Sequence, residues 1–167
     1  MAETDEAAFM RRAFEIAEAA MAEPGGSAYA AVLVRDGMIV GEGGSCPPDL
    51  FDPTAHAEII ALRDAAAKLR TLDLGDCELF STAEPCAMCA AALWWARVRK
   101  VTYAAGRPDF LAGGLDLDQL DAHLASPSPP HRRLMRAEGS ELFAAWRARP
   151  WYGDQARKWT PEPPEGA

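Results

Sequence analysis

Two short stretches decide how this chain is interpreted: residues 56–58 are His-Ala-Glu, and residues 85–89 are Pro-Cys-Ala-Met-Cys. His56, Cys86 and Cys89 together offer one nitrogen and two sulfur atoms, which are donors that Zn²⁺ accepts in proteins. A structural zinc site normally has four protein ligands, whereas a catalytic site keeps one position for water. Three protein donors therefore predict a catalytic zinc centre.

The residues around these donors fit the same prediction. Glu58 lies two positions after His56, so it can face a water on the metal without coordinating the metal itself. Cys86 and Cys89 are three positions apart, which places both sulfur atoms on one face of the first turn of a helix. Pro85 suits a helix start, and a helix N-terminus stabilises the thiolate over the thiol. Glu58 is therefore the candidate catalytic residue.

The composition is that of an ordinary globular protein. The chain has 167 residues, with 49% hydrophobic and 25% charged residues, enough for one domain with a substantial core. We expect that domain over residues 1–160 and a disordered Pro-rich tail over residues 161–167. No apolar run could cross a bilayer, and the acidic N-terminal segment does not resemble a secretory signal. These features predict a cytoplasmic protein in which Cys46 and Cys77 stay free thiols.

The charge balance favours a small-molecule substrate. The formal net charge is −8 and the sequence pI is about 4.9, whereas proteins that grip a polyanion usually present a basic surface. Basic residues gather at residues 97–100 and 131–136, and we expect both groups to be solvated surface side chains. The sequence therefore argues against nucleic acid as a partner.

Hydrophobic periodicity predicts an α/β domain in which strands and helices alternate. Helices are expected over residues 4–21, 55–69, 85–97 and 140–148. Strands are expected over residues 29–35, 38–41, 77–82, 98–104 and 134–137. Loops are expected over residues 41–52 and 106–115, with a surface connection over residues 126–130. Both motif helices follow loops at one side of the sheet, so their N-termini are predicted to converge on a single ion.

Several stretches together resemble the cytidine-deaminase-like superfamily, and within it the bacterial guanine deaminases. These stretches are residues 52–58, 84–89, 95–97, 103–105 and 143–147. The resemblance covers about residues 25–146 and implies a three-layer α/β/α sandwich with a central mixed sheet of about five strands. It also implies hydrolytic removal of an exocyclic amine, and a homodimer in which the subunits exchange C-terminal segments.

The chain departs from this subfamily at two positions. Ser45 stands where family members commonly have an Asn that contacts the base, and one hydroxyl cannot replace both the donor and the acceptor of an amide. Leu117 stands where guanine deaminases have an acid, with Asp116 and Asp118 on either side. We therefore expect guanine as the favoured substrate, and these two departures keep another aminated heterocycle as the alternative. The candidate substrate-binding residues are Tyr29, Ser45, Ala57, Trp95 and Asp116.

The expected mechanism and its alternatives follow from these assignments. The metal lowers the pKa of a bound water toward ~7, and Glu58 carries a proton from that water to a ring nitrogen. Glu58 then delivers a proton to the amine, and ammonia leaves. One alternative is a deaminase of cytosine, a nucleoside or another heterocycle. A second is a tRNA adenosine deaminase, against which the acidic pI argues. A third is a non-catalytic zinc scaffold, which would not need Glu58.

Overall fold

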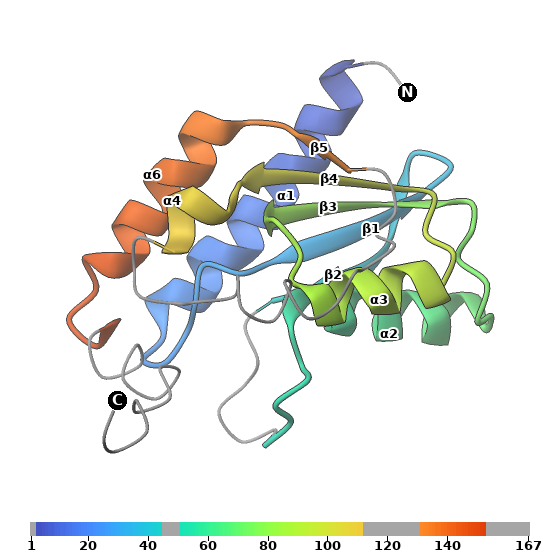
Figure 1. Cartoon of the computed structure of the whole chain (residues 1–167), viewed down its shortest axis with the longest axis horizontal. Helices are drawn as coiled ribbons and strands as arrows, with labels where there is room; N and C mark the ends of the chain where they lie inside the picture. Colours follow the sequence, from blue (N-terminus) through green and yellow to red (C-terminus); the bar gives the residue numbers. More distant parts are fainter. Residues whose placement is uncertain (1–2, 45–50, 112–130, 153–167) are drawn as a thin grey trace, which may run out of the picture.

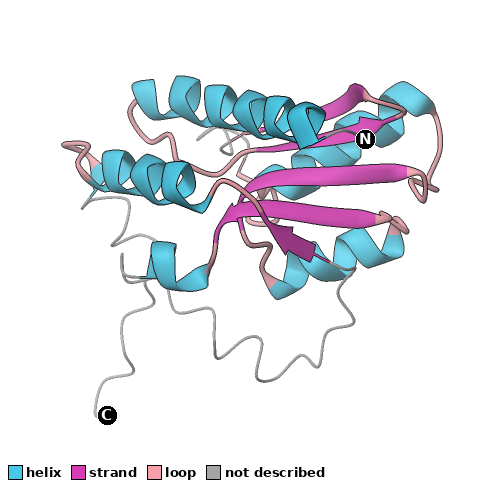
Figure 2. Ribbon diagram, turned by 90° about the horizontal axis from the view of Figure 1, so that it is seen from above, coloured by secondary structure: helices cyan, strands magenta, loops and turns pink. Residues whose placement is uncertain are grey.

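A mixed five-stranded sheet forms the centre of the molecule in the computed structural model, which describes residues 3–44, 51–111 and 131–152. The strands are β1 (Ala31–Arg35), β2 (Met38–Gly43), β3 (Cys77–Ala83), β4 (Lys100–Ala105) and β5 (His131–Arg133). Their order across the sheet is β2-β1-β3-β4-β5, with β1 antiparallel to both neighbours and β3, β4 and β5 parallel. Figure 2 shows the strands following one another across the molecule with a twist.

Helices cover both faces of this sheet (Figure 1). The helices α2 (Ala57–Leu69) and α3 (Ala87–Trp95) pack on one face, in a core that includes Leu79 and Val101. The helices α1 (Glu3–Ala22) and α6 (Arg136–Arg147) pack on the opposite face. The three-layer α/β/α prediction is therefore confirmed.

The strand β1 lies between two neighbours and is buried over Ala31–Val34, as its continuous apolar sequence predicts. Asp36 and Gly37 both have positive φ, 50° and 75°, and they form the tight turn that returns the chain as β2. The strand β1 begins two residues later than predicted, at Ala31. The strand β2 continues two residues further than predicted, to Gly43.

Two glycines let the edge strand β2 pack directly on α2. A Cβ atom on Gly43 would lie 2.0 Å from the carbonyl oxygen of Ala57, and one on Gly41 would lie 2.3 Å from that of Ala61. No side chain fits in either place, so the strand backbone sets the position of the first turns of α2. This matters because α2 begins immediately after His56.

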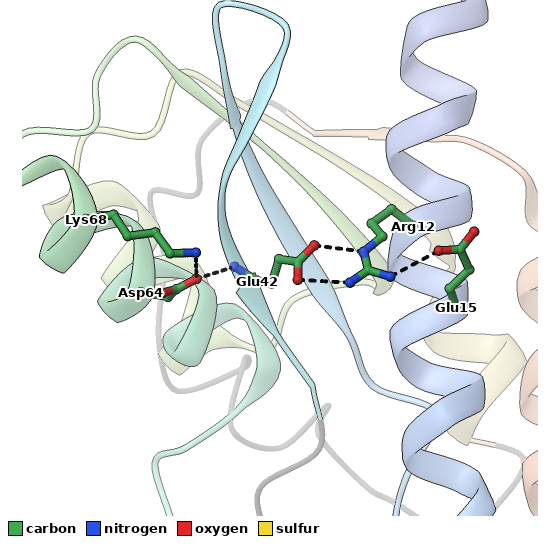
Figure 3. A network of polar contacts seen from close by, with 5 residues as sticks. All are labelled: Arg12, Glu15, Glu42, Asp64 and Lys68. Atoms are coloured by element: carbon green, nitrogen blue, oxygen red, sulfur yellow. Dashed lines mark hydrogen bonds and ion pairs between the residues drawn. The ribbon is translucent and has the colours of Figure 1, made fainter.

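A polar network joins the helices on the two faces across the edge of the sheet (Figure 3). The guanidinium of Arg12 on α1 donates two hydrogen bonds to the carboxylate of Glu42 on β2, at 2.8 and 3.1 Å. The backbone N–H of Glu42 donates to Asp64 on α2 at 2.9 Å, and Lys68 donates to the same carboxylate at 2.7 Å. The network therefore holds α1, β2 and α2 in one arrangement.

The predicted loop over residues 106–115 is wrong in its first part, because α4 (Arg107–Leu111) is helical. Side chains stabilise its start: Asp109 accepts the N–H of Gly106 at 2.9 Å, and Glu84 accepts the N–H of Arg107 at 3.1 Å. Glu84 lies 23 positions earlier in the sequence, so local patterns could not indicate this helix.

The predicted strand over residues 134–137 is also wrong. The strand β5 occupies His131–Arg133, and Met135, with φ of 56°, ends the extended segment before α6. The parallel ladder to β4 and the ion pairs of Arg132 with Glu6 and of Arg133 with Asp109 fix the strand there. Leu134 and Met135 instead pack against the core beside α1.

The basic residues near residue 97 form ion pairs, which differs from the prediction that they are only solvated. Arg97 pairs with Asp73 at 3.1 Å, Arg99 with Glu78 at 2.5 Å and Lys100 with Glu6 at 2.7 Å. The basic groups predicted to be merely solvated therefore have acidic partners. The predictions for residues 45–50, 112–130 and 153–167, including Cys46, the connection and the tail, lie outside the described residues. None of the described helices combines the length and apolarity needed to cross a membrane.

Candidate metal centre

The N-termini of α2 and α3 meet at one point, as the sequence predicts. His56 is the residue that precedes α2, and Cys86 is the residue that precedes α3, with Cys89 in its first turn. The Nδ1 atom of His56 lies 3.6 Å from the sulfur of Cys86 and 3.5 Å from that of Cys89, and the two sulfurs are 3.6 Å apart. His56 and Cys86 are 30 positions apart in the sequence, and the fold brings the three donors together.

These separations fit a zinc ion. Zn–S bonds of ~2.3 Å and Zn–N bonds of ~2.0–2.1 Å at tetrahedral angles place sulfur atoms about 3.8 Å apart, and nitrogen about 3.6 Å from sulfur. The observed separations are 3.6 Å for the sulfur pair and 3.5–3.6 Å for nitrogen to sulfur. The donor set is positioned to bind Zn²⁺ with little rearrangement.

The cluster has three members, which leaves a position for a non-protein ligand. Among the residues that the structure describes, His56, Cys86 and Cys89 form the one group of three or more His, Cys, Asp or Glu donors close enough to share an ion. Glu58 is not in this group, although its Oε2 atom lies 3.5 Å from the sulfur of Cys89. Its carboxylate therefore lies beside the centre without completing it.

The contact between the two thiols shifts their pKa values in opposite directions. The hydrogen bond from Cys89 lowers the pKa of Cys86 to about 4, and His56 contributes in the same direction. The same hydrogen bond and burial raise the pKa of Cys89. The contact with Cys86 raises the pKa of His56. A thiolate with two further donors beside it favours a cation, which must displace the remaining protons to bind.

Glu58 occupies an unusual position for a carboxylate. Its side chain belongs to the first turn of α2, and the residue is only 5% exposed. Burial raises the pKa of Glu58, because the charged form loses its hydration. A carboxyl group that holds its proton more tightly than usual can both accept and deliver a proton near neutral pH.

The segment before His56 is ordered by a small polar cluster. Asp52 accepts the backbone N–H of Thr54 at 2.8 Å and its hydroxyl at 2.6 Å, and Arg63 on α2 donates to the same carboxylate at 2.9 Å. The N–H of His56 then donates to the carbonyl of Thr54 at 2.8 Å. The sequence motif contains Asp52 and Thr54 but not Arg63, and only the structure shows that these three residues order the segment before His56.

Tyr29 lies between the centre and an aromatic cluster on the opposite face. Its ring contacts Phe143 and Trp146 of α6 edge to face, with centroids 5.4 and 5.6 Å away. Burial raises the pKa of Tyr29, and the charges of Glu58 and Cys86 raise it further. Thr82 fixes the adjoining backbone, accepting the N–H of Ala30 at 3.0 Å and donating to Ala28 at 2.8 Å. No pattern in the sequence indicates this role of Thr82.

The other candidate substrate-binding residues are placed differently. Ala57 is buried, at 1% exposure, beside His56 and Glu58. Trp95 is 78% exposed at the far end of α3, nine positions from Cys86, which is roughly 13 Å along a helix axis. Ser45 and Asp116 lie outside the described residues. The structure therefore brings Tyr29 and Ala57 to the centre and leaves Trp95 away from it.

Comparisons with known proteins agree with this geometry. The model of the cytidine and deoxycytidylate deaminase zinc-binding region matches residues 3–105. Guanine deaminase of Bacillus subtilis (strain 168) is 36% identical over 143 residues, covering 83% of this chain and 92% of that protein. A tRNA-specific adenosine deaminase of Aquifex aeolicus (strain VF5) is 41% identical over 83 residues, covering 50% of this chain and 55% of that protein.

Solved structures of similar proteins also include a guanine deaminase. Guanine deaminase from Nitrosomonas europaea superposes with a TM-score of 0.75 at 30% identity, covering 89% of this chain and 87% of that one. A mutant protein in complex with 8-azaguanine superposes with a TM-score of 0.74 at 31% identity, covering 87% and 86% of the two chains. With its donors spaced for zinc and its family match spanning residues 3–105, the chain belongs to the zinc-dependent cytidine and deoxycytidylate deaminase family.

Proposed function

We propose that this protein removes the exocyclic amine of guanine by hydrolysis, with His56, Cys86 and Cys89 as zinc ligands and Glu58 as the catalytic residue. The observation that carries the proposal is a buried carboxylate beside three donors at 3.5–3.6 Å from one another. Guanine is the favoured base because the Bacillus subtilis guanine deaminase aligns over 92% of its own length.

The chemistry divides between the metal and the chain. A zinc ion held by these donors acidifies water and so supplies a nucleophile at neutral pH. The carboxylate of Glu58 accepts one proton of the attacking water and delivers it to a ring nitrogen. It then accepts the second proton of that water and delivers it to the departing amine, which leaves as ammonia. Its raised pKa suits both roles, because the acid and base forms are then closer in energy at neutral pH.

The surrounding residues hold the substrate and exclude water. Tyr29 offers an aromatic ring that burial and its contacts with α6 keep in one orientation. Ala57 offers backbone groups at the start of α2, next to the ligand His56. We retain Ser45 and Asp116 as proposed contacts on the strength of the sequence alone.

An ammonia-release screen of the zinc-loaded protein tests the proposal. Guanine, adenine, cytosine, their nucleosides, pterins and triazines are offered at equal concentration, and chelator-treated protein serves as the control. We expect release from guanine, loss of activity after chelation and recovery on adding Zn²⁺. Release from cytosine or a nucleoside instead of guanine would favour the second substrate class. No release from any compound by zinc-loaded protein would favour a scaffold.

A tRNA substrate has less support. The tRNA-specific relative covers 50% of this chain, and the net charge is −8. Several basic residues already have acidic partners, as in the pairs of Arg97 with Asp73 and Arg99 with Glu78. We therefore propose that the protein does not bind nucleic acid. A gel shift with tRNA, together with sequencing for inosine, tests this, and a shift with inosine formation contradicts it.

We further propose a cytoplasmic homodimer built from a single-domain chain over residues 1–160. The exposed apolar end of α3 supports the dimer: Trp94 is 51% and Trp95 78% exposed, and their rings lie edge to face at 5.4 Å. This placement makes Trp95 a contact between copies rather than a contact to the base in its own chain. Sedimentation of the wild type and of Trp95→Ser tests the proposal, with a monomer expected for the variant.

A further inference from the structure

Cys86 is joined to the helix that follows it through its carbonyl, which accepts the N–H of Ala90 at 2.8 Å. Cys86 precedes α3 with an extended backbone, φ −70° and ψ 169°, and its side chain makes no capping hydrogen bond to the helix. Pro85 stands immediately before it, and the pyrrolidine ring fixes the φ angle of that residue. A displacement at the residue before Pro85 is therefore passed on to Cys86.

That residue is Glu84, and a different part of the chain holds it at both backbone and side chain. Its N–H donates to the carbonyl of Ala105, at the end of β4, at 2.9 Å. Its Oε2 atom accepts the backbone N–H of Arg107 at 3.1 Å, and its Oε1 atom lies 3.5 Å from Nε of the same residue. The side chains of Glu84 and Arg107 are 22% and 21% exposed, so solvent screens this ion pair less than a surface pair.

The helix α4, which begins with the Glu84 partner Arg107, is held in place by further contacts of Asp109. Asp109 accepts the N–H of Gly106 and pairs with Arg133 and Arg136, and the carbonyl of Asp109 accepts a hydrogen bond from Arg147 of α6. The carboxylate of Glu84 thus connects the thiol-bearing turn to a segment fixed by β5 and α6.

We propose that Glu84 is a positioning residue whose carboxylate holds the turn between β3 and α3 so that Cys86 faces His56 and Cys89. This inference rests on the zinc centre of the proposed function. Within the described part of the chain, the hydrogen bonds and the ion pair of Glu84 go to Ala105 and Arg107 and to none of the metal donors. It acts through the backbone of Pro85, and its effect is to slow the release of the metal.

The experiment measures the rate of zinc release from the zinc-loaded full chain to an excess of a chromogenic chelator. Glu84→Ala removes both contacts to Arg107, and we expect about tenfold faster release, at the lower end of the effect of supporting residues at metal sites. Glu84→Gln keeps an oxygen that accepts the N–H of Arg107, and we expect a rate within about twofold of the wild type, since one neutral hydrogen bond is retained.

Glu78→Ala is the matched control. Glu78 lies on the same strand, β3, and also pairs with an arginine, but it lies at the opposite end from the thiol turn. Unchanged zinc release is expected for this variant. Equal acceleration in Glu78→Ala and Glu84→Ala would show a general loosening of β3 and overturn the proposal, as would a wild-type rate in Glu84→Ala.

Two further measurements separate the possible failures. If Glu84→Ala does not fold, Arg107→Leu removes the side-chain partner but leaves the N–H, and a smaller acceleration is expected; a wild-type rate then overturns the proposal. Wild-type protein that does not hold one zinc per chain contradicts the metal centre itself. Normal zinc binding without guanine turnover contradicts only the proposed substrate. The role of Glu84 is then still supported by the rates of zinc release from its variants.

Discussion

At the residue scale, the proposed chemistry depends on a carboxylate that is buried beside the cluster of metal donors yet is not part of it. Glu58 lies 3.5 Å from the sulfur of Cys89, but the three clustered donors are His56, Cys86 and Cys89. Burying a carboxylate is costly, and proteins retain such groups where a proton must move. We therefore assign metal binding and proton transfer to different side chains, and separate variants test the two roles.

Glu58→Gln tests the proton-transfer role. The amide keeps the size and much of the hydrogen bonding of the carboxyl group but cannot exchange a proton, so zinc content should be unchanged. We expect the rate of ammonia release to fall on the order of 10²–10⁴. Metal analysis and the ammonia assay on the same preparation check both parts. A rate close to that of the wild type removes Glu58 from its proposed role.

Cys86→Ala tests the ligand role. Removing one of three donors should lower zinc content from about one ion per chain to a small fraction, since a two-donor site holds zinc weakly. Cys77→Ala is the control, because Cys77 is also a buried free thiol but lies outside the cluster. Elemental analysis after gel filtration measures both, and full occupancy in Cys86→Ala contradicts the assignment.

At the element scale, two buried threonines on neighbouring strands differ in one respect. Both Thr82 on β3 and Thr102 on β4 are fully buried. The hydroxyl of Thr82 accepts one hydrogen bond and donates another, whereas that of Thr102 makes none within the described residues. The first hydroxyl extends the pairing of β1 with β3 beyond Ala31, and the second is a desolvated polar group without compensation.

This difference predicts opposite effects of the same substitution. Thr102→Val should raise the free energy of unfolding by about 1 kcal/mol, because it removes an unpaired hydroxyl without changing the side-chain shape. Thr82→Val should lower it by about 1–3 kcal/mol, because it leaves two backbone groups unpaired. Urea denaturation of both variants measures the changes. A loss of stability in Thr102→Val would show that its hydroxyl has a partner after all.

At the scale of the whole molecule, stability depends on a contact that crosses the layers. Arg12 on α1 holds the carboxylate of Glu42 on β2 through two hydrogen bonds, and these bonds lower the pKa of Glu42 (Figure 3). A carboxyl group with a lower pKa in the folded chain stabilises the fold above its unfolded pKa. That stabilisation is lost as the pH falls through the folded pKa.

The free energy of unfolding should therefore decrease as the pH falls from about 5 toward about 3, in part through Glu42. In Glu42→Gln this part of the decrease should be absent, so the pH dependence becomes shallower. Glu15→Gln is the control, because its carboxylate meets the same guanidinium at 3.1 Å but is 63% exposed. Thermal unfolding across this pH range measures the slopes, and equal slopes for Glu42→Gln and the wild type contradict the prediction.

The sequence by itself determined the three clustered donors, the α/β class and most elements, because these depend on local spacing. It also determined that Glu58 lies beside those donors, and its catalytic role stays a prediction. Helix periodicity runs through residues 57–69, and the spacing of Cys86 and Cys89 follows from one turn of helix. The convergence of the two motif helices also followed, since both begin at one side of the sheet. Local patterns are reliable where neighbours in sequence are neighbours in space.

Only the tertiary structure decided the short elements and the contacts that hold the site. The helix α4 and the strand β5 depend on Glu84, Asp109 and Glu6, which lie far from their partners in the sequence. The exposure of Trp95 and the double hydrogen bonding of Thr82 likewise depend on how the layers pack. The physical reason is that a short segment gains too little from its own periodicity, so its conformation is set by side chains that the fold brings to it.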